Sequence, residues 1–302
     1  MAGTAAPTVP RKGCSNTALA CALDRGRAFL LASQNADGLW PYHPQKPGAP
    51  EPTCYALLAV GQEAAARERA IPAIARLVDS VANPAGKFEL EWHRSLFLLA
   101  LSRLGAAPEL CRRLSQALLE ITVRELNPEI KEFDPSLKGW GWVGGTASWV
   151  EPTSYALLAL KCSGVRNHPR VQEAERLLLD RPCDDGGWNY GNRIVYGAKL
   201  TSNPPTTALA ALALQGVPAA SEQLKKALSF LRREASSQPS ALSVSLAILA
   251  LDAYRGPAGD LLQLLVRRQS NDGSWRGQIY PTALATLALQ AIQERNNAFR
   301  IA

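Results

Sequence analysis

Two kinds of apolar segment alternate along the chain, and they differ in how often polar residues interrupt them. The first kind carries leucine and phenylalanine three and four residues apart among charged residues, as in 23–34, 171–180 and 259–269. This spacing predicts helices with one face in solvent. The second kind is rich in alanine and leucine and almost uncharged, at 55–60, 94–104, 155–161, 206–215, 242–251 and 282–292. Without a polar face, these segments are expected to be helices buried on most sides.

A short turn motif recurs between the two kinds of helix. "QNADGLW" at 34–40 returns as "PCDDGGW" at 182–188 and "QSNDGSW" at 269–275, so all three share Asp-Gly-x-Trp. Their tryptophans are 148 and 87 residues apart, or about three and two periods in the mid-forties. A weaker copy, "NPAGKF" at 83–88, has Phe88 in the place of the tryptophan. Each repeat therefore predicts one outer helix followed by one inner helix.

Six outer helices alternating with six inner helices predict an all-α fold, a single α6/α6 toroid built from six helix pairs. We expect the ring to close because the count is complete and neither end carries a polar capping helix. The toroid is assigned to residues 16–302. Residues 1–15 lack a continuous apolar segment typical of a signal peptide and are expected to form a flexible N-terminal tail.

Pro-Thr pairs mark the starts of four inner helices, at 52–53, 152–153, 205–206 and 281–282. Proline suits the first turn of a helix, where its missing N–H has no intrahelical partner to lose. The inner helices should then begin at one end of the ring, where their dipoles favour anions and carboxylates. Glu-Pro-Thr occurs at 51–53 and again at 151–153, 100 residues later. We expect any functional site at this mouth of the ring.

The pattern Gln-x-x-x-Gly-x-Trp at 34–40 and 269–275 resembles the QW motif (prenyltransferase/squalene oxidase repeat) of squalene–hopene cyclases and related terpenoid cyclases. Their toroid is shared with the β-subunits of protein prenyltransferases. The resemblance spans most of the chain and implies a single-barrel relative that handles an isoprenoid or another apolar small molecule. It also implies that the glutamine and tryptophan of each repeat are structural.

Class II terpenoid cyclases start by protonating an alkene or epoxide with the middle aspartate of an Asp-x-Asp-Asp-Thr-Ala motif. By this resemblance, Glu151 in "WVEPTS" takes the place of that acid, and Glu51 and Tyr280 occupy the equivalent position in two other repeats. The flanking carboxylates of the motif are replaced by Trp149 and Pro152. The resemblance therefore implies a small, class II-like cyclase with Glu151 as the acid. Alternatively, a glutamate at a helix N-terminus only stabilises the helix, by about 0.3–1 kcal/mol.

Other candidate site residues are expected at the same mouth. His93, at the start of the second inner helix, either assists catalysis with Glu51 as a base or is an ordinary polar residue. Two stretches without helical periodicity, 134–149 and 187–205, bring further aromatic side chains and an anion partner. These side chains either surround a substrate and its carbocation or close the core. The substrate-binding candidates are Tyr55, Trp142, Trp149, Tyr155, Tyr190, Arg193 and Tyr280.

The composition limits the kinds of ligand and partner that we expect the protein to bind. A net charge of +7 and a pI of about 9.2 fit an anionic ligand or peripheral contact with an anionic membrane surface, but no dense Lys/Arg run indicates nucleic-acid binding. Six scattered cysteines without a C-x-x-C pair predict reduced thiols and a cytoplasmic location. The chain has only three histidines and lacks both the Asp-x-Cys zinc motif of the protein prenyltransferases that it resembles and the Asp-rich magnesium motif of class I terpene synthases. We therefore expect no metal site and no cofactor.

A second function class stays open. Aromatic residues make up only 7% of the chain, and the inner helices consist largely of alanine, leucine, serine and threonine. These residues predict a narrow, smooth pore that suits an apolar chain or no ligand. The alternative is a non-catalytic toroid that binds a lipid, an isoprenoid or a protein partner at its mouth.

Overall fold

The computed structural model describes residues 16–81, 92–238 and 240–301, and within them the chain forms twelve α-helices and one short hairpin. The outer helices are α1 (Asn16–Ala32), α3 (Ala64–Val81), α5 (Pro108–Glu120), α7 (Pro169–Asp180), α9 (Ser221–Glu234) and α11 (Gly259–Arg267). The inner helices are α2 (Pro50–Val60), α4 (Trp92–Arg103), α6 (Val150–Cys162), α8 (Pro204–Ala213), α10 (Ala241–Ala253) and α12 (Ile279–Gln293). Strands β1 (Ile194–Val195) and β2 (Ala198–Lys199) pair antiparallel in the loop before α8.

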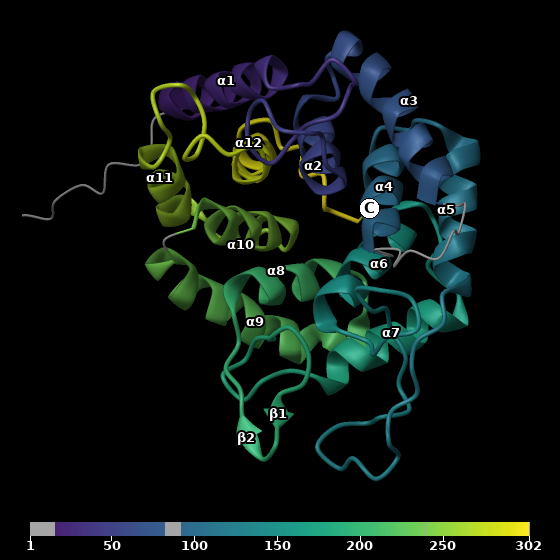
Figure 1. Ribbon diagram of the computed structural model, residues 1–302. Coiled ribbons are helices and arrows are strands. Elements are labelled where there is room, and N and C mark those ends of the chain that lie inside the picture. Colours follow the sequence, from purple (N-terminus) through teal and green to yellow (C-terminus); the bar gives the residue numbers. More distant parts are fainter. Residues whose placement is uncertain (1–15, 82–91, 239, 302) are drawn as a thin grey trace, which may run out of the picture.

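The inner helices form a closed ring, and the outer helices surround it (Figure 1). Each inner helix contacts the inner helices on both sides of it, and α12 contacts both α10 and α2. Each later outer helix packs on the inner helix that precedes it in the chain, whereas α1 packs on α12. The first helix thus closes the ring against the last one. The predicted all-α toroid of six helix pairs is confirmed.

The two classes of helix differ in burial as their sequences predicted. In α10, every residue from Ser243 to Leu251 is buried, which fits a helix without a polar face. In α5, the buried leucines are Leu110, Leu114 and Leu118, four residues apart along one stripe. Burial of the alanine-rich inner ring and of one stripe on each outer helix supplies the main driving force for the fold.

Tryptophans tie the outer helices to the inner ones in four of the turns. Each indole Nε1–H donates to a carbonyl oxygen of the preceding outer helix, at 2.7–2.9 Å. The main-chain N–H of the same tryptophan donates 2.9 Å to a threonine hydroxyl in the first turn of the following inner helix. The pairs are Trp40 with Thr53, Trp140 with Thr153, Trp188 with Thr207 and Trp275 with Thr282. The structural role expected for the repeated tryptophans therefore has a direct physical basis.

Two details of the repeat differ from the sequence interpretation. Trp140 is a fourth scaffold tryptophan, only 2% exposed, although its turn lacks the Asp-Gly-x-Trp pattern. The Pro-Thr pair at 205–206 is out of register by one residue, because Thr207 makes the hydrogen bond to Trp188. The copy at 83–88 and the tail at 1–15 lie outside the described residues.

The two ends of the ring are different. The inner helices begin at one end, the mouth, and the last residues of the chain cover the other end. Asn297 donates to the Leu249 carbonyl at 2.9 Å, and Gln215 donates to the Phe299 carbonyl at 2.7 Å. These contacts bury the Phe299 ring, which lies 6.2 Å from the ring of Tyr55, a residue midway along α2. In Figure 1 the yellow segment that follows α12 accordingly runs from α12 towards α4.

Candidate functional site

The second residue of each inner helix lies in the first turn, at the mouth. Around the ring these residues are Tyr280 on α12, Glu51 on α2, His93 on α4, Glu151 on α6, Pro205 on α8 and Leu242 on α10. Polar side chains thus occupy four consecutive helices, and apolar ones occupy the remaining two. The sequence placed Glu51, His93, Glu151 and Tyr280 at one mouth, and the fold brings them to neighbouring helices there.

One turn deeper, aromatic side chains fill the ring. Tyr55, Phe97 and Tyr155 stand four residues after Glu51, His93 and Glu151, and all three are at most 2% exposed. The ring of Tyr55 stacks on that of Tyr280, with centroids 5.1 Å apart. The narrow, smooth pore predicted from composition is therefore replaced, at this depth, by a floor of aromatic rings.

Glu51 is held by a neighbouring tyrosine. The Tyr42 hydroxyl donates a 2.7 Å hydrogen bond to Glu51 Oε2. Burial raises the pKa of Glu51, and the hydroxyls of Tyr42 and Tyr280 oppose this shift because they stabilise the carboxylate. The ring of Tyr280 also meets Tyr42 edge-on, at 6.4 Å between centroids. These contacts fix the carboxyl group of Glu51 between two aromatic residues.

Glu151 is the more strongly perturbed carboxyl group. Burial is the main cause, and the negative charge of Glu51 adds to it, so that the pKa of Glu151 rises to about 7. The Tyr155 hydroxyl lies 3.5 Å from Glu151 Oε1, a long contact that opposes the shift only in part. Glu151 therefore exchanges its proton near neutral pH, far above the range of an ordinary glutamate. The mouth holds one group that can donate a proton and, in Glu51, a second carboxyl group that can accept one.

The pKa of His93 is shifted in the opposite direction to that of Glu151. Burial lowers the pKa of His93 to about 4, so its imidazole is neutral at physiological pH. Its ring centroid is 4.3 Å from that of Trp92. Trp92 in turn meets Trp142 edge-on at 5.5 Å and stacks on Tyr155 at 6.1 Å, with the two ring planes 30° apart. A neutral His93 can accept a proton or a hydrogen bond, within a wall of aromatic rings between α4 and α6.

The other predicted binding residues form a second group beside the mouth. Trp149 is the residue before α6 and is 41% exposed, and Tyr190 is 54% exposed. Arg193 donates from Nε and Nη2 to the Glu132 carbonyl, at 3.3 and 3.2 Å. The structure therefore divides the predicted residues into a mouth cluster (Glu51, Tyr55, His93, Trp142, Glu151, Tyr155 and Tyr280) and a loop group (Trp149, Tyr190 and Arg193).

Two residues that shape the site, one at the mouth and one beneath its aromatic floor, were missed from the sequence, although a signal for the first was present. The 100-residue register that relates Glu51 to Glu151 also relates Tyr42 to Trp142, and so Tyr42 could have been assigned to the site. The same register relates Trp40 to Trp140 and marks Trp140 as scaffold. Phe299, which packs beneath the floor, follows no repeat, and nothing in its sequence context predicted its position.

Within the described ranges, no group of three or more histidine, cysteine, aspartate or glutamate side chains is placed to hold a metal ion. None of the helices in these ranges is long and apolar enough to cross a membrane. The side chains at the mouth offer two carboxyl groups, an imidazole, hydroxyls and aromatic faces.

Comparison by sequence finds no matching protein family and no matching curated protein. By structure, the chain is similar to the type II terpene cyclase MstE from Scytonema, with a TM-score of 0.64 and 17% identity over 94% of this chain and 100% of that one. A protein from Actinoplanes gives a TM-score of 0.63 and 21% identity over 90% and 98% of the two chains. A glycosidase variant gives a TM-score of 0.58 and 12% identity over 92% of this chain and 97% of that one.

These similarities define the class of fold. The chain is an α/α toroid like that of type II terpene cyclases, as the repeats predicted. A glycosidase has the same fold, so the toroid does not determine the reaction, and function has to be argued from the mouth itself.

Proposed function

We propose that this protein is an isoprenoid-handling enzyme that starts a cyclisation by proton transfer from Glu151. The observation that carries the proposal is the pair of partly buried carboxyl groups at equivalent positions of α2 and α6, one of which has a pKa of about 7. A group that stays partly protonated at neutral pH can act as a general acid. Structures of MstE with geranylgeranyl dihydroxybenzoate and with merosterolic acid A support an isoprenoid ligand for a toroid of this kind.

In the proposed reaction, the Glu151 proton adds to one carbon of an alkene, and the other carbon becomes a cation. A second alkene of the same chain attacks this cation, which forms a carbon–carbon bond and moves the charge along the chain. Loss of a proton to the Glu51 carboxylate then restores an alkene. Exchange with solvent returns both carboxyl groups to their starting states, and the product has the mass of the substrate.

The aromatic wall supports this chemistry. A carbocation lacks hydrogen-bonding atoms and is stabilised by the negative faces of aromatic rings. Trp92, Trp142 and Tyr155 lie together beside Glu151, with ring centroids 5.5 and 6.1 Å apart. His93, neutral because of burial, is a second candidate for the group that accepts the final proton.

The second candidate is a toroid that binds an isoprenoid, another lipid or a protein partner at its mouth without catalysis. The packing of aromatic rings inside the toroid favours it, because the buried ring of Tyr55 lies 5.1 Å from that of Tyr280 and 6.2 Å from that of Phe299, and these rings reduce the space for a long polyene. Contact with a membrane surface and a cytoplasmic location stay predictions of the sequence.

The test is incubation of the purified protein with squalene and with C15 and C20 prenyl diphosphates, with and without Mg²⁺, followed by mass spectrometry of the extracts. We expect a new isomer of unchanged mass that is lost in Glu151→Gln. Glu109→Gln, at an exposed carboxylate on α5, is the matched control and should keep the activity. Absence of any product with the intact enzyme would reject the cyclase and leave the binding function.

A further inference from the structure

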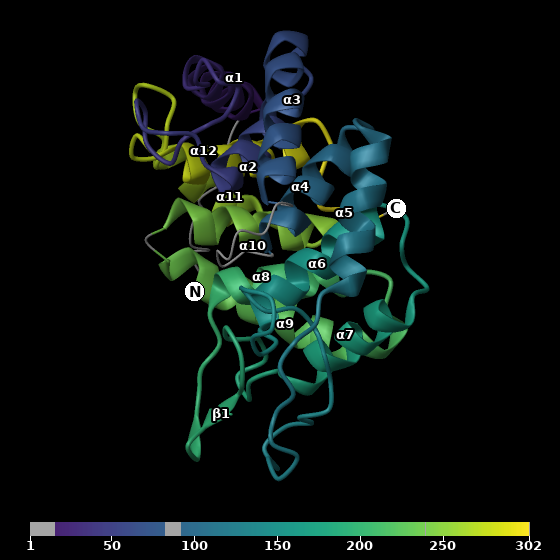
Figure 2. The ribbon, with the colours of Figure 1, turned by 45° about the vertical axis from the view of Figure 1, so that its right-hand side comes forward.

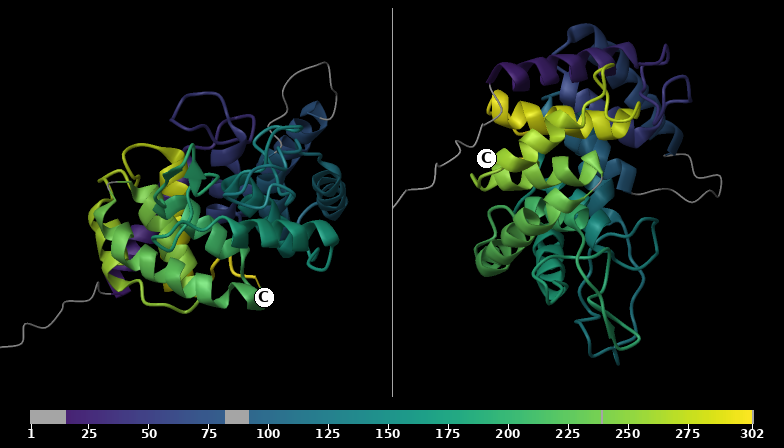
Figure 3. Two further views of the ribbon diagram at one scale, coloured as in Figure 1. Left: turned by 90° about the horizontal axis from the view of Figure 1, so that it is seen from below. Right: turned by 90° about the vertical axis from the view of Figure 1, so that its left-hand side faces the viewer.

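Two long loops project together beyond the helices of the ring, one from 121 to 149 between α5 and α6 and one from 181 to 203 between α7 and α8 (Figure 2 and the right-hand view of Figure 3). A groove of about 400 Å³ lies between them. Its apolar lining comes from both loops and includes Leu126, Ile130, Phe133, Trp149, Val195 and Leu200. Three of these side chains, Trp149, Val195 and Leu200, are large, apolar and about 40% exposed.

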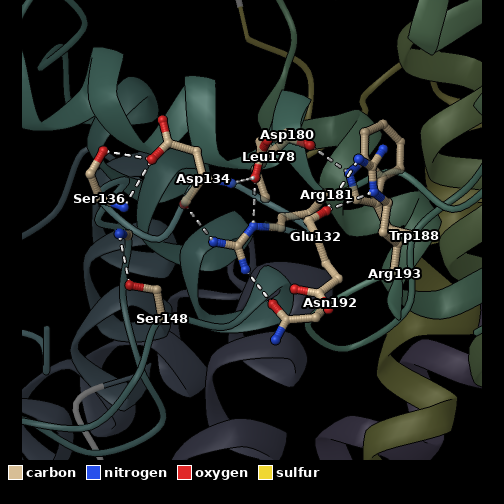
Figure 4. A network of polar contacts seen from close by, with 11 residues as sticks. Glu132, Asp134, Ser136, Ser148, Leu178, Asp180, Arg181, Trp188, Asn192 and Arg193 are labelled. Carbon is tan, nitrogen blue, oxygen red and sulfur yellow. Dashed lines mark hydrogen bonds and ion pairs between the residues drawn. The ribbon is translucent and has the colours of Figure 1, made fainter. Parts of the chain in front are cut away.

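The walls of the groove are held together by a buried arginine (Figure 4). The side chain of Arg181 is only 3% exposed, and its guanidinium lies 3.8 Å from the centre of the Phe133 ring. It donates to the Asp134 carbonyl at 3.3 Å in the first loop and to Asn192 Oδ1 in the second. One side chain thus joins both loops, and the groove exists before any ligand binds.

Two further contacts fix the second loop. Arg193 donates to the Glu132 carbonyl of the first loop from two guanidinium nitrogens. Gly191 packs against the Trp149 indole so closely that a Cβ atom there would lie 2.9 Å from the ring. A pre-formed site loses less conformational entropy on binding than one that orders around its ligand.

Two polar side chains that line the groove, Asn189 and Ser148, already make hydrogen bonds within the protein. Asn189 accepts a hydrogen bond from the Gly191 N–H at 2.9 Å and donates to the Asn192 carbonyl at 3.0 Å. Ser148 Oγ accepts from the Gly139 N–H at 2.9 Å. A ligand in the groove therefore meets mainly apolar surface, which favours a hydrocarbon over a peptide or a sugar.

The groove adjoins the mouth. Trp149 lines the groove two residues before Glu151, and the Val150 N–H donates 2.9 Å to the Tyr190 carbonyl, which joins the start of α6 to the second loop. On the other side of Glu151, the aromatic floor and Phe299 fill the axis of the ring. A long apolar chain whose end lies at Glu151 therefore finds its space along the loops.

We propose that the groove binds the apolar tail of an isoprenoid whose reactive end lies at Glu151. The groove volume falls in the range of small-molecule sites, about 300–1,000 Å³, and fits a single chain. This inference rests on the proposed function for the identity of the ligand, but the binding itself does not require turnover.

The experiment is photo-crosslinking of the full chain with geranylgeraniol that carries a diazirine at its tail, followed by peptide mass spectrometry. We expect label on peptides from 121–149 and 187–203. Val195→Asp and Leu126→Asp place a charge in the groove and should each lower the labelling at least fivefold. Tyr196→Asn is the control, because Tyr196 is fully exposed at the hairpin tip outside the groove and has a positive φ that asparagine tolerates.

Label confined to the inner helices, or labelling unchanged by both aspartate variants, would overturn the proposal. Labelling that appears only with phosphatidylglycerol vesicles and disappears in Tyr196→Asn would also overturn it and assign the hairpin to membrane contact. Circular dichroism and the melting temperature establish that each variant is folded. If the groove is labelled but no product forms, the proposed cyclase activity is refuted and the binding groove is retained. If product forms but only the inner helices are labelled, the groove is refuted and the cyclase activity is retained.

Discussion

Glu51 and Glu151 are equivalent residues of two repeats, and the charge of Glu51 helps to raise the pKa of Glu151 to about 7. Both follow the first residue of an inner helix, and both helices begin at the mouth. Helix dipoles alone would favour ionised carboxylates there. Burial and the charge of Glu51 outweigh this effect for Glu151, which therefore binds a proton more tightly than an exposed carboxyl group at a helix terminus would.

Replacing Glu51 by glutamine should lower the pKa of Glu151. The substitution removes the repulsive charge and keeps the shape of the side chain, whereas the burial of Glu151 is unchanged. The pKa should therefore fall below about 7 and stay above its usual value of 4.5. Titration of ¹³C-labelled glutamate carboxyl groups by NMR measures it. An unchanged pKa in Glu51→Gln would show that burial alone perturbs Glu151.

Glu151→Gln should stabilise the protein at high pH. Because the carboxyl group has a higher pKa in the folded than in the unfolded chain, the folded state binds more protons between pH 4.5 and about 7, and stability falls as pH rises through this window. Glutamine does not titrate, so the stability of the variant does not fall in this window. Above pH 7 its free energy of unfolding should exceed that of the wild type by up to about 3 kcal/mol. Below pH 4 the two should be equal.

Urea unfolding at pH 4, 6 and 8 gives the comparison. Glu109→Gln, at the exposed carboxylate on α5, serves as the control and should show no such pH-dependent gain. A Glu151→Gln variant that is less stable than the wild type at pH 8 would contradict the raised pKa.

Thr153→Val should destabilise the fold although it removes no volume. The Thr153 hydroxyl accepts from the Trp140 N–H at 2.9 Å and lies 3.2 Å from the carbonyl of the same residue, where it donates. Valine leaves the buried N–H without a partner, which costs about 1–3 kcal/mol. The free energy of unfolding in urea measures the loss. Thr153→Ser keeps the hydroxyl, so its free energy of unfolding should fall distinctly less than that of Thr153→Val. Equal decreases in the two variants would show that packing of the methyl group, and not the hydrogen bond, stabilises the fold.

Phe299→Ala should lower the free energy of unfolding by about 3–5 kcal/mol, the range for replacing a buried phenylalanine by alanine in a protein core. The ring packs near Tyr55 at the centre of the toroid, where a cavity would form. Unfolding in urea is again the measurement, and Ile301→Ala, at a half-buried position of the same tail, should lose less. A loss under about 1 kcal/mol for Phe299→Ala would show that the tail does not fill the ring in solution.

The sequence by itself determined the helical ring. Periodicity separates outer from inner helices, and the repeated tryptophans mark the turns between them. These signals are local or repeat at a constant spacing, so they can be found along a single chain. They also placed Glu51, His93 and Glu151 at the starts of three inner helices, because equivalent residues of a repeat occupy equivalent positions in a ring.

Only the tertiary structure decided what those positions can do. The pKa of Glu151 depends on its depth of burial and on Glu51, which is 100 residues away in the chain. The filling of the ring depends on Phe299, and the groove depends on Arg181, which joins two loops without periodic pattern. Such contacts join segments whose separation in sequence is large and irregular. Their energies arise from packing and electrostatics in the folded chain, and no spacing of residue types encodes them.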